Sequence, residues 1–175
     1  MSEIFVPSQV FISPKLVDGF ENLLTRVQGL TTNSLVFATI GQVELVPRVF
    51  SVDQNNARVK ITFIGQIVGV AGTKQFRAQI DGVTFYTTAS ANQATNPGSF
   101  EIDIIVIFRN NQFIPFLRSK MGDSAGGGLN INSLGSATAG FAAFDPSISH
   151  TVTLQALVAN AADSIVCNWI GGSFR

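Results

Sequence analysis

Few residues in this 175-residue chain could perform catalysis, and the first candidates surround its single histidine. His150 follows Asp145 by five residues, with Ser147 and Ser149 between them. Serine, histidine and aspartate form the triad of many hydrolases, and Cys167 with His150 would form a thiol pair. The serines, however, lie in no Gly-x-Ser-x-Gly turn, and they share the entry to one expected strand with His150. We therefore expect no catalytic residue here and a His150 that bonds to nearby backbone.

Two further candidates also favour structural roles. Cys167 alternates with Ile165 and Trp169, which predicts an inward row where a small thiol packs in the core. Glu101 and Asp103 lie two residues apart, on one face of an expected strand. Glycosidases use such carboxylate pairs, but a solvated outer edge of a sheet is the commoner explanation. The sequence therefore predicts no enzyme.

Metal and phosphate sites are not expected either. One histidine and one cysteine do not supply the three or four ligands that zinc needs. Asp123 is solitary, and no calcium-binding loop spacing occurs. Residues 69–74, Gly-Val-Ala-Gly-Thr-Lys, lack the spacing of a phosphate-binding loop and predict a turn between strands. We expect no cofactor and no metal.

From about residue 35 the hydrophobic pattern has a period of two, which indicates β-strands. Asp81-Gly82 separates two alternating runs, and this dipeptide favours a tight hairpin in which both residues have positive φ. A second hairpin is expected at residues 160–163. The inward positions of the expected strands are Val59, Ile61, Phe63, Phe76, Ala78, Ile80, Val83, Phe85, Phe100, Ile102, Ile104, Val106, Val152, Leu154, Ala156, Ile165 and Cys167. Short strands are also expected near 35–40, 43–50 and 112–118. Eight or more strands predict an all-β domain, either two sheets packed face to face or a barrel.

The first 34 residues differ from this pattern. Residues 4–12 contain Pro7 and suit an extended arm, and Ser13-Pro14 then forms an N-cap with a first-turn proline. Apolar residues at helical spacing predict a short helix over 14–28. We therefore divide the chain into an N-terminal arm and helix, 1–34, and a β-domain, 35–175. Loops are expected at 89–99 and at the glycine-rich segment 121–136.

Several outward positions of the expected strands are apolar, although an outward face in water is normally polar. These positions are Ile64, Val68, Val70, Ile105, Ile107, Leu157, Val166 and Ile170. One short helix cannot cover rows from three strands, so burial between subunits is expected, as a dimer or trimer.

The overall composition excludes several partners. Eleven basic and eleven acidic residues leave no net charge, so the basic stripe of a nucleic-acid-binding domain is missing. No apolar run approaches the ~20 residues that span a membrane as a helix. Fifteen Phe against one Tyr and one Trp favour a core or subunit interface and count against a lectin. A single cysteine is typical of assembly in a reducing cytoplasm.

The C-terminal residues resemble a known family. Residues 144–156, Phe-Asp-Pro-Ser-Ile-Ser-His-Thr-Val-Thr-Leu-Gln-Ala, followed by Asn-Ala-Ala-Asp-Ser-Ile at 160–165, look like the last two strands of trimeric jelly-roll virion proteins of tailed bacteriophages. The resemblance covers about thirty residues closely. It implies a double-sheet jelly roll like that of tumour necrosis factor, and a homotrimer bound to the major capsid protein or another virion protein.

Two functions are therefore expected. The first is a capsid-decorating or cement protein, assembled in the host cytoplasm, that stabilises the phage head by binding its shell. The alternative is a receptor- or glycan-binding module of a tail fibre or knob, which would use the loops 89–99 and 121–136. Fold alone does not decide between them.

Overall fold

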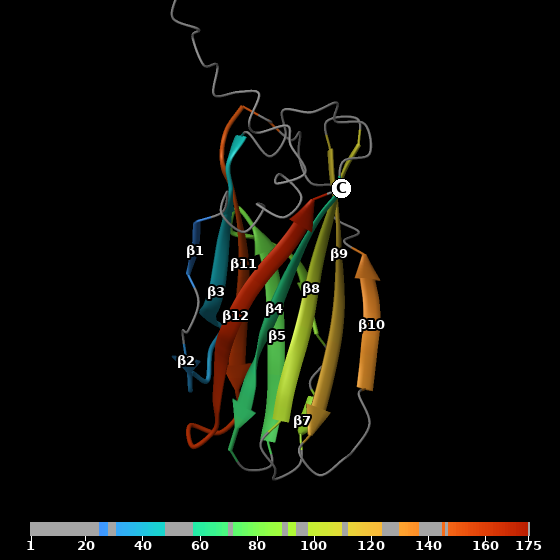
Figure 1. The fold of residues 1–175 in the computed structure, drawn as a ribbon. Coiled ribbons are helices and arrows are strands. Elements are labelled where there is room, and N and C mark those ends of the chain that lie inside the picture. Colours follow the sequence, from blue (N-terminus) through green and yellow to red (C-terminus); the bar gives the residue numbers. More distant parts are fainter. Residues whose placement is uncertain are drawn as a thin grey trace, which may run out of the picture.

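The computed structural model describes residues 25–27, 31–47, 58–69, 72–88, 91–93, 98–109, 112–123, 130–136, 145 and 147–174. These residues form twelve strands in two antiparallel sheets, so the chain is an all-β protein (Figure 1). No α-helix occurs among them. Within the same part of the chain, nothing is both helical and long and apolar enough to cross a membrane.

The first sheet has the order β1-β3-β11-β5-β6, and β7 also pairs with β5. Its strands are β1 (Thr25–Val27), β3 (Ala38–Leu45), β11 (His150–Val158), β5 (Gly72–Ile80), β6 (Val83–Thr87) and β7 (Ala91–Gln93). The second sheet has the order β10-β9-β8-β4-β12-β2. Its strands are β10 (Asn130–Ser136), β9 (Gln112–Asp123), β8 (Gly98–Arg109), β4 (Arg58–Val68), β12 (Ser164–Phe174) and β2 (Thr31–Thr32).

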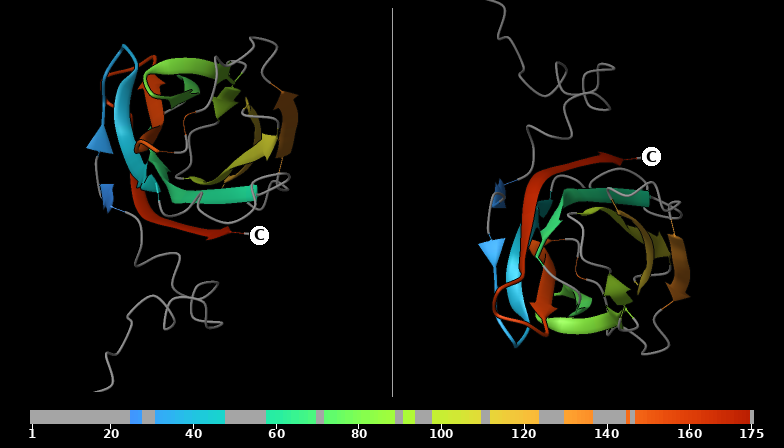
Figure 2. Two further views of the ribbon diagram at one scale, coloured as in Figure 1. Left: turned by 90° about the horizontal axis from the view of Figure 1, so that it is seen from above. Right: turned by 90° about the horizontal axis from the view of Figure 1, so that it is seen from below.

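One hydrophobic core joins the two sheets, which curve around it when the molecule is seen along the strands (Figure 2). The period-two rows that the sequence predicts as inward are buried, apart from Val83, which is 54% exposed. Phe76 of the first sheet and Phe100 of the second meet with ring centroids 4.9 Å apart, at a tilted angle typical of aromatic pairs. Successive side chains of a strand point to opposite faces of the sheet, so the apolar residues at every second position identify the side chains of the core.

The two expected hairpins are confirmed. Asp81 has a φ of 50° and Gly82 a φ of 78°, and they connect β5 to β6 as the dipeptide predicts. Residues 159–163 connect β11 to β12, where the Asn160 side chain accepts a hydrogen bond from the Ala162 N–H at 3.0 Å. Asn160 closes this turn locally, as asparagine commonly does.

The N-terminal expectations are wrong in part. Residues 25–27 lie at the end of the predicted helix 14–28, but they form β1 and pair with β3 at Gln42, Val43 and Glu44. Pairing with an existing strand edge here overrides the helical spacing of the local sequence. The remainder of that helix and the arm, residues 1–24, lie outside the described residues. β1 and β2 both precede residue 34 and are already part of the sheets, while the domain division 1–34 and 35–175 stays a prediction.

Four predicted segments have different boundaries. The strands expected at 35–40 and 43–50 are one continuous strand, β3. The expected loop 121–136 instead contains the end of β9 and all of β10, which pair with each other. The expected loop 89–99 contains the short strand β7, and β8 begins at Gly98. Glycine and serine are poor strand formers, so the alternation rule does not detect β10.

A β-bulge in β12 reverses two side chains relative to the prediction. The register against β4 shifts between Cys167 and Trp169, which places one extra residue in β12. Trp169 therefore points outward and is 41% exposed, whereas Ile170 points inward and is 1% exposed. The expectations of an inward Trp169 and an outward Ile170 are both wrong for this one reason.

Candidate functional site

His150 is held at both ring nitrogens. Its Nδ1 lies 2.7 Å from Oδ2 of Asp81, and its Nε2 lies 2.8 Å from the backbone oxygen of Asp145. A carbonyl and a carboxylate oxygen are hydrogen-bond acceptors, so both ring nitrogens face acceptors other than a serine hydroxyl. The expectation that His150 bonds to nearby backbone is confirmed.

The other members of the imagined triad have separate partners. The Ser147 hydroxyl donates to Oδ1 of Asp145 at 2.6 Å, and the Ser147 N–H donates to the same oxygen at 2.9 Å. Both hydrogen bonds lower the pKa of the Asp145 carboxyl, and the bond from the Ser147 hydroxyl has the larger effect. The structure thus brings Asp145, Ser147 and His150 together, but as the capped start of β11 rather than as a proton relay.

Asp81 is a residue whose second role the sequence did not reveal. Its Oδ1 accepts the Thr151 N–H at 2.7 Å, and its own N–H donates to the Thr151 oxygen at 2.8 Å. The Asp-Gly signal predicted only a turn. Together with the His150 bond, these contacts tie the β5–β6 turn to the start of β11. We call the tied region, residues 81–83, 145 and 147–151, the His150 corner.

Cys167 lies fully buried in the inward row of β12, as the sequence predicts. Burial raises the pKa of its thiol to about 11, and backbone hydrogen bonds with Trp169 and Ile64 offset only part of this rise. The Sγ lies 3.6 Å from the Trp169 backbone oxygen. A neutral, covered thiol is a poor nucleophile. This position therefore suits packing.

A thiol-labelling experiment tests this. We expect Ellman's reagent at neutral pH to leave the native thiol unmodified and to react with it fully in denaturant. Because the folded pKa is raised, the thiol contributes stability that is present below about pH 9 and lost as the pH rises towards 11. A Cys167→Ala variant should lack this alkaline loss. Rapid labelling of the native protein would contradict the burial of Cys167.

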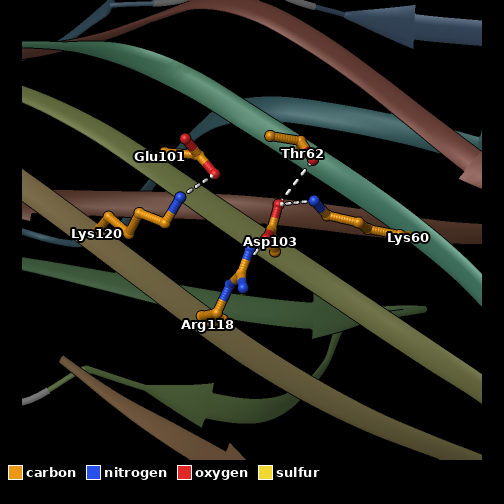
Figure 3. A network of polar contacts seen from close by, with 6 residues as sticks. All are labelled: Lys60, Thr62, Glu101, Asp103, Arg118 and Lys120. Carbon is orange, nitrogen blue, oxygen red and sulfur yellow. Dashed lines mark hydrogen bonds and ion pairs between the residues drawn. The ribbon is translucent and has the colours of Figure 1, made fainter. Parts of the chain in front are cut away.

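The two carboxylates of β8, Glu101 and Asp103, belong to a network on the outer face of the second sheet (Figure 3). The register places Thr62 of β4, Asp103 and Arg118 of β9 side by side in one row. Thr62 donates to Oδ1 of Asp103 at 2.7 Å, and Lys60 lies 3.0 Å from the same oxygen. Arg118 contacts Oδ2 with its Nη2 at 2.6 Å and its Nε at 3.0 Å. Asp103 is thereby surrounded on the outer side of the sheet.

These neighbours cover Asp103, which is only 1% exposed, while Lys60 and Arg118 remain 32% and 41% exposed. Burial alone would raise the pKa of Asp103, but the hydrogen bonds from Thr62, Lys60 and Arg118 more than offset it, and the pKa is lowered. The expectation of a solvated edge is therefore wrong for Asp103. Glu101 instead pairs with Lys120 at 3.0 Å and is 35% exposed. An ionised Asp103 that neutralises two cations is unsuited to donate a proton.

Removing the Asp103 charge should destabilise the fold. We expect Asp103→Asn to lower the free energy of unfolding by about 1–3 kcal/mol near neutral pH, because Lys60 and Arg118 lose their shared counter-charge. The folded pKa lies below the ordinary 3.8, so the wild-type advantage is complete above about pH 4 and is lost in more acidic solution. Urea unfolding at several pH values measures both effects. The control Glu101→Gln, at an exposed pair, should cost below about 1 kcal/mol, and equal losses in both variants would contradict this account.

Apolar side chains flank this charged network on both sides. Ile64 and Val68 of β4 are 39% and 45% exposed, and Trp169 of β12 lies opposite Ile64 in the register. At the other end, Ile105, Ile107, Ile114 and Phe116 are partly exposed. Exposed Ile64 and Val68, and partly exposed Ile105, Ile107 and Val166, confirm the predicted outward rows in this sheet. We call this surface of β12, β4, β8 and β9 the outer face of the second sheet.

The described residues contain no group of three or more histidine, cysteine, aspartate or glutamate side chains that could hold a metal ion. A surface that combines exposed apolar side chains with charged ones is suited to contact with another macromolecule. The outer face of the second sheet is therefore the candidate site. The sequence pointed to its apolar rows and to both carboxylates, but not to Lys60, Thr62, Arg118 and Lys120 as their partners.

Comparisons with known proteins show no family. No protein family and no curated protein matches the chain. A functionally unknown protein from Saccharomyces cerevisiae is similar in structure with a TM-score of 0.27 and 10% identity, over 85% of this chain and 96% of that chain. A polysaccharide lyase of family 18 is similar with a TM-score of 0.26 and 8% identity, over 93% of this chain and 98% of that chain. Similarities this weak carry no argument about function.

Proposed function

We propose that the two sheets form a jelly roll. A jelly roll arises when eight strands pair from the outside inwards, the first with the last, and the resulting ribbon wraps into two sheets. Eight strands here support that pattern, because β2 pairs with β12, β3 with β11, β4 with β8, and β5 with β6. Wrapping then places β12 beside β4 and β11 beside β5. Strands β1, β7, β9 and β10 are additions to this set.

We propose further that the protein is a structural protein of a bacteriophage virion, a homotrimer that decorates the capsid and stabilises its shell. The observation that carries this proposal is the exposure of Ile64, Val68 and Trp169 on the outer face of the second sheet. Large apolar side chains on neighbouring strands gain free energy when a partner covers them, at about 25 cal/mol per Å². A protein that acts by association needs such a surface and needs no catalytic centre.

This role implies particular partners. The first is a second and third copy of the chain, and the next is the major capsid protein or another virion protein. Assembly would take place in the host cytoplasm, with neither a cofactor nor nucleic acid nor a membrane. The mixed charges beside the apolar side chains support specific rather than indiscriminate association, because charges set which surfaces can meet.

Two measurements test the proposal. Light scattering coupled to size exclusion should give three times the chain mass of 18.7 kDa at micromolar concentration, whereas a monodisperse monomer would contradict the trimer. Quantitative mass spectrometry of purified virions should then find many copies on each head. A handful of copies at the tail would favour the second candidate, and absence from particles would refute a virion role.

One observation favours a receptor- or glycan-binding module as the second candidate. The single tryptophan, Trp169, is 41% exposed instead of buried in the core. An exposed indole can stack on a sugar ring and still hydrogen-bond water. Glycan-array binding that Trp169→Phe preserves and Trp169→Ala abolishes would support this candidate. No binding to any glycan would leave only the structural role.

A further inference from the structure

We propose that the outer face of the second sheet receives the His150 corner of another copy, so that copies associate head to tail. This inference rests on the proposed function, because it names the two surfaces through which the copies would meet. It is carried by the distribution of charge, by the exposed apolar side chains, and by the rigidity of the corner.

The outer face of the second sheet is basic. Its described charged side chains are four cations, Arg58, Lys60, Arg118 and Lys120, and two carboxylates, Glu101 and Asp103. Their formal net charge is +2. The three cations that form ion pairs keep 28–41% of their side-chain surface exposed, so they can still attract a negative partner.

The first sheet and the His150 corner are acidic among the residues whose side chains the structure describes. Apart from Lys74, which pairs with Asp163 in the interior, these charged side chains are Arg77 and the carboxylates Glu44, Asp81 and Asp145. Their formal net charge is −2. Asp81 and Asp145 belong to the His150 corner, and Glu44 lies beside it, opposite Thr151 in the register. His150 itself lies inside the corner, since its side chain is only 5% exposed.

Opposite charges on different surfaces favour one kind of contact between copies. Two outer faces of the second sheet would repel each other at +2 each, which disfavours a two-fold dimer through this face. A basic face against an acidic corner attracts instead. Such a contact joins different surfaces of the two copies and closes into a ring if the rotation allows, as in a trimer.

Apolar side chains accompany the charges on both surfaces. Val83 and Ile148 of the His150 corner are 54% and 52% exposed, beside Asp81 and Asp145. Ile64 and Trp169 on the outer face are 39% and 41% exposed, beside the Glu101–Lys120 pair. Each surface therefore combines exposed apolar side chains with a net charge, and the two net charges are opposite in sign. This combination supplies both affinity and orientation.

The His150 bonds make the corner a preformed surface. His150 contacts Asp81 from one connection and Asp145 from another, so the turn that carries Val83 and the segment that carries Ile148 are both tied to the start of β11. A surface that is already ordered loses less conformational entropy on binding. His150 thus has a positioning role in association.

Engineered cysteines test the contact in the full-length chain. One preparation carries Ile148→Cys and another, with a tag of different mass, carries Ile64→Cys. The native Cys167 is fully buried and does not compete. Under mild oxidation, we expect the mixture to form the mixed disulfide dimer at least about tenfold faster than either preparation forms its own dimer. Thr87→Cys, an exposed position on β6, replaces Ile148→Cys in the control mixture and should give no such increase.

The outcomes separate this inference from the proposed function. Fast dimerisation of Ile64→Cys alone would show face-to-face contact and overturn the inference. A trimeric wild type without the mixed cross-link would overturn the inference and leave the structural role standing. A monomeric wild type that still binds capsids would also overturn the inference and leave the structural role standing. The outer face would then be the surface that binds a capsid protein. A monomer that is also absent from virions would refute both.

Discussion

Gly65→Ala is expected to lower the free energy of unfolding by about 3 kcal/mol or more. A Cβ at Gly65 would lie 2.0 Å from the backbone oxygen of Val166 and 2.5 Å from the ring of Phe100. Neither neighbour can move aside at low energetic cost, because one is backbone of the paired strand and the other fills the core. Gly65 stands opposite Cys167, where the bulge of β12 begins. The glycine therefore permits the close approach of β12 that turns Trp169 outward.

Urea unfolding followed by circular dichroism measures this effect. Gly82→Asn is the matched control, since Gly82 has a positive φ but nothing within 4 Å of a built Cβ. Asparagine tolerates that backbone region, so the control should lose about 1 kcal/mol or less. If Gly65→Ala unfolded at the wild-type urea concentration, the close contact between β4 and β12 would be wrong.

Lys74→Met should be similarly damaging, with an expected loss of about 3–5 kcal/mol. Lys74 occupies an inward position of β5, in line with Phe76 and Ala78, and its Nζ lies 2.9 Å from Oδ2 of Asp163. The two side chains are only 2% and 0% exposed. Removing the cation leaves a carboxylate buried without its counter-charge, which costs far more than the pair itself contributes.

A second substitution distinguishes this cause from lost packing. In the double variant Lys74→Met with Asp163→Asn, no charge remains buried, so we expect recovery of at least about half of the loss. Lys120→Met is the control, since its pair with Glu101 is partly exposed and should contribute less than about 1 kcal/mol. Equal losses in the single and double variants would show that the charge is not the reason.

Features that depend on local alternation are well predicted by the sequence. The inward rows of β4, β5, β8 and β11 and the Asp81-Gly82 turn are confirmed, because side-chain period and turn preference are properties of neighbouring residues. The outward apolar residues that define the outer face of the second sheet obey the same rule. The fold class and half of the candidate site were therefore predictable.

The failures share one physical origin, which is contact between segments distant in sequence. The bulge in β12 depends on the space that Gly65 leaves in another strand, so Trp169 and Ile170 were assigned to the wrong sides. Lys74 stands in a core row only because Asp163 meets it from another turn. Residues 25–27 are a strand because β3 offers an edge, against their helical spacing. The partners of Asp103 come from two neighbouring strands and could not be assigned without the register.

The pairing of early strands with late ones has a consequence for synthesis on the ribosome. β11 separates β3 from β5, and β12 separates β2 from β4, so each sheet has a vacancy until the last strands emerge. Pairings between segments distant in sequence form slowly, so the strands on either side of β11 and β12 stay unjoined until these two strands are available. A premature stop codon before β11 would thus yield a product with neither sheet joined, and cellular proteases should remove this product before it can act as a shortened protein.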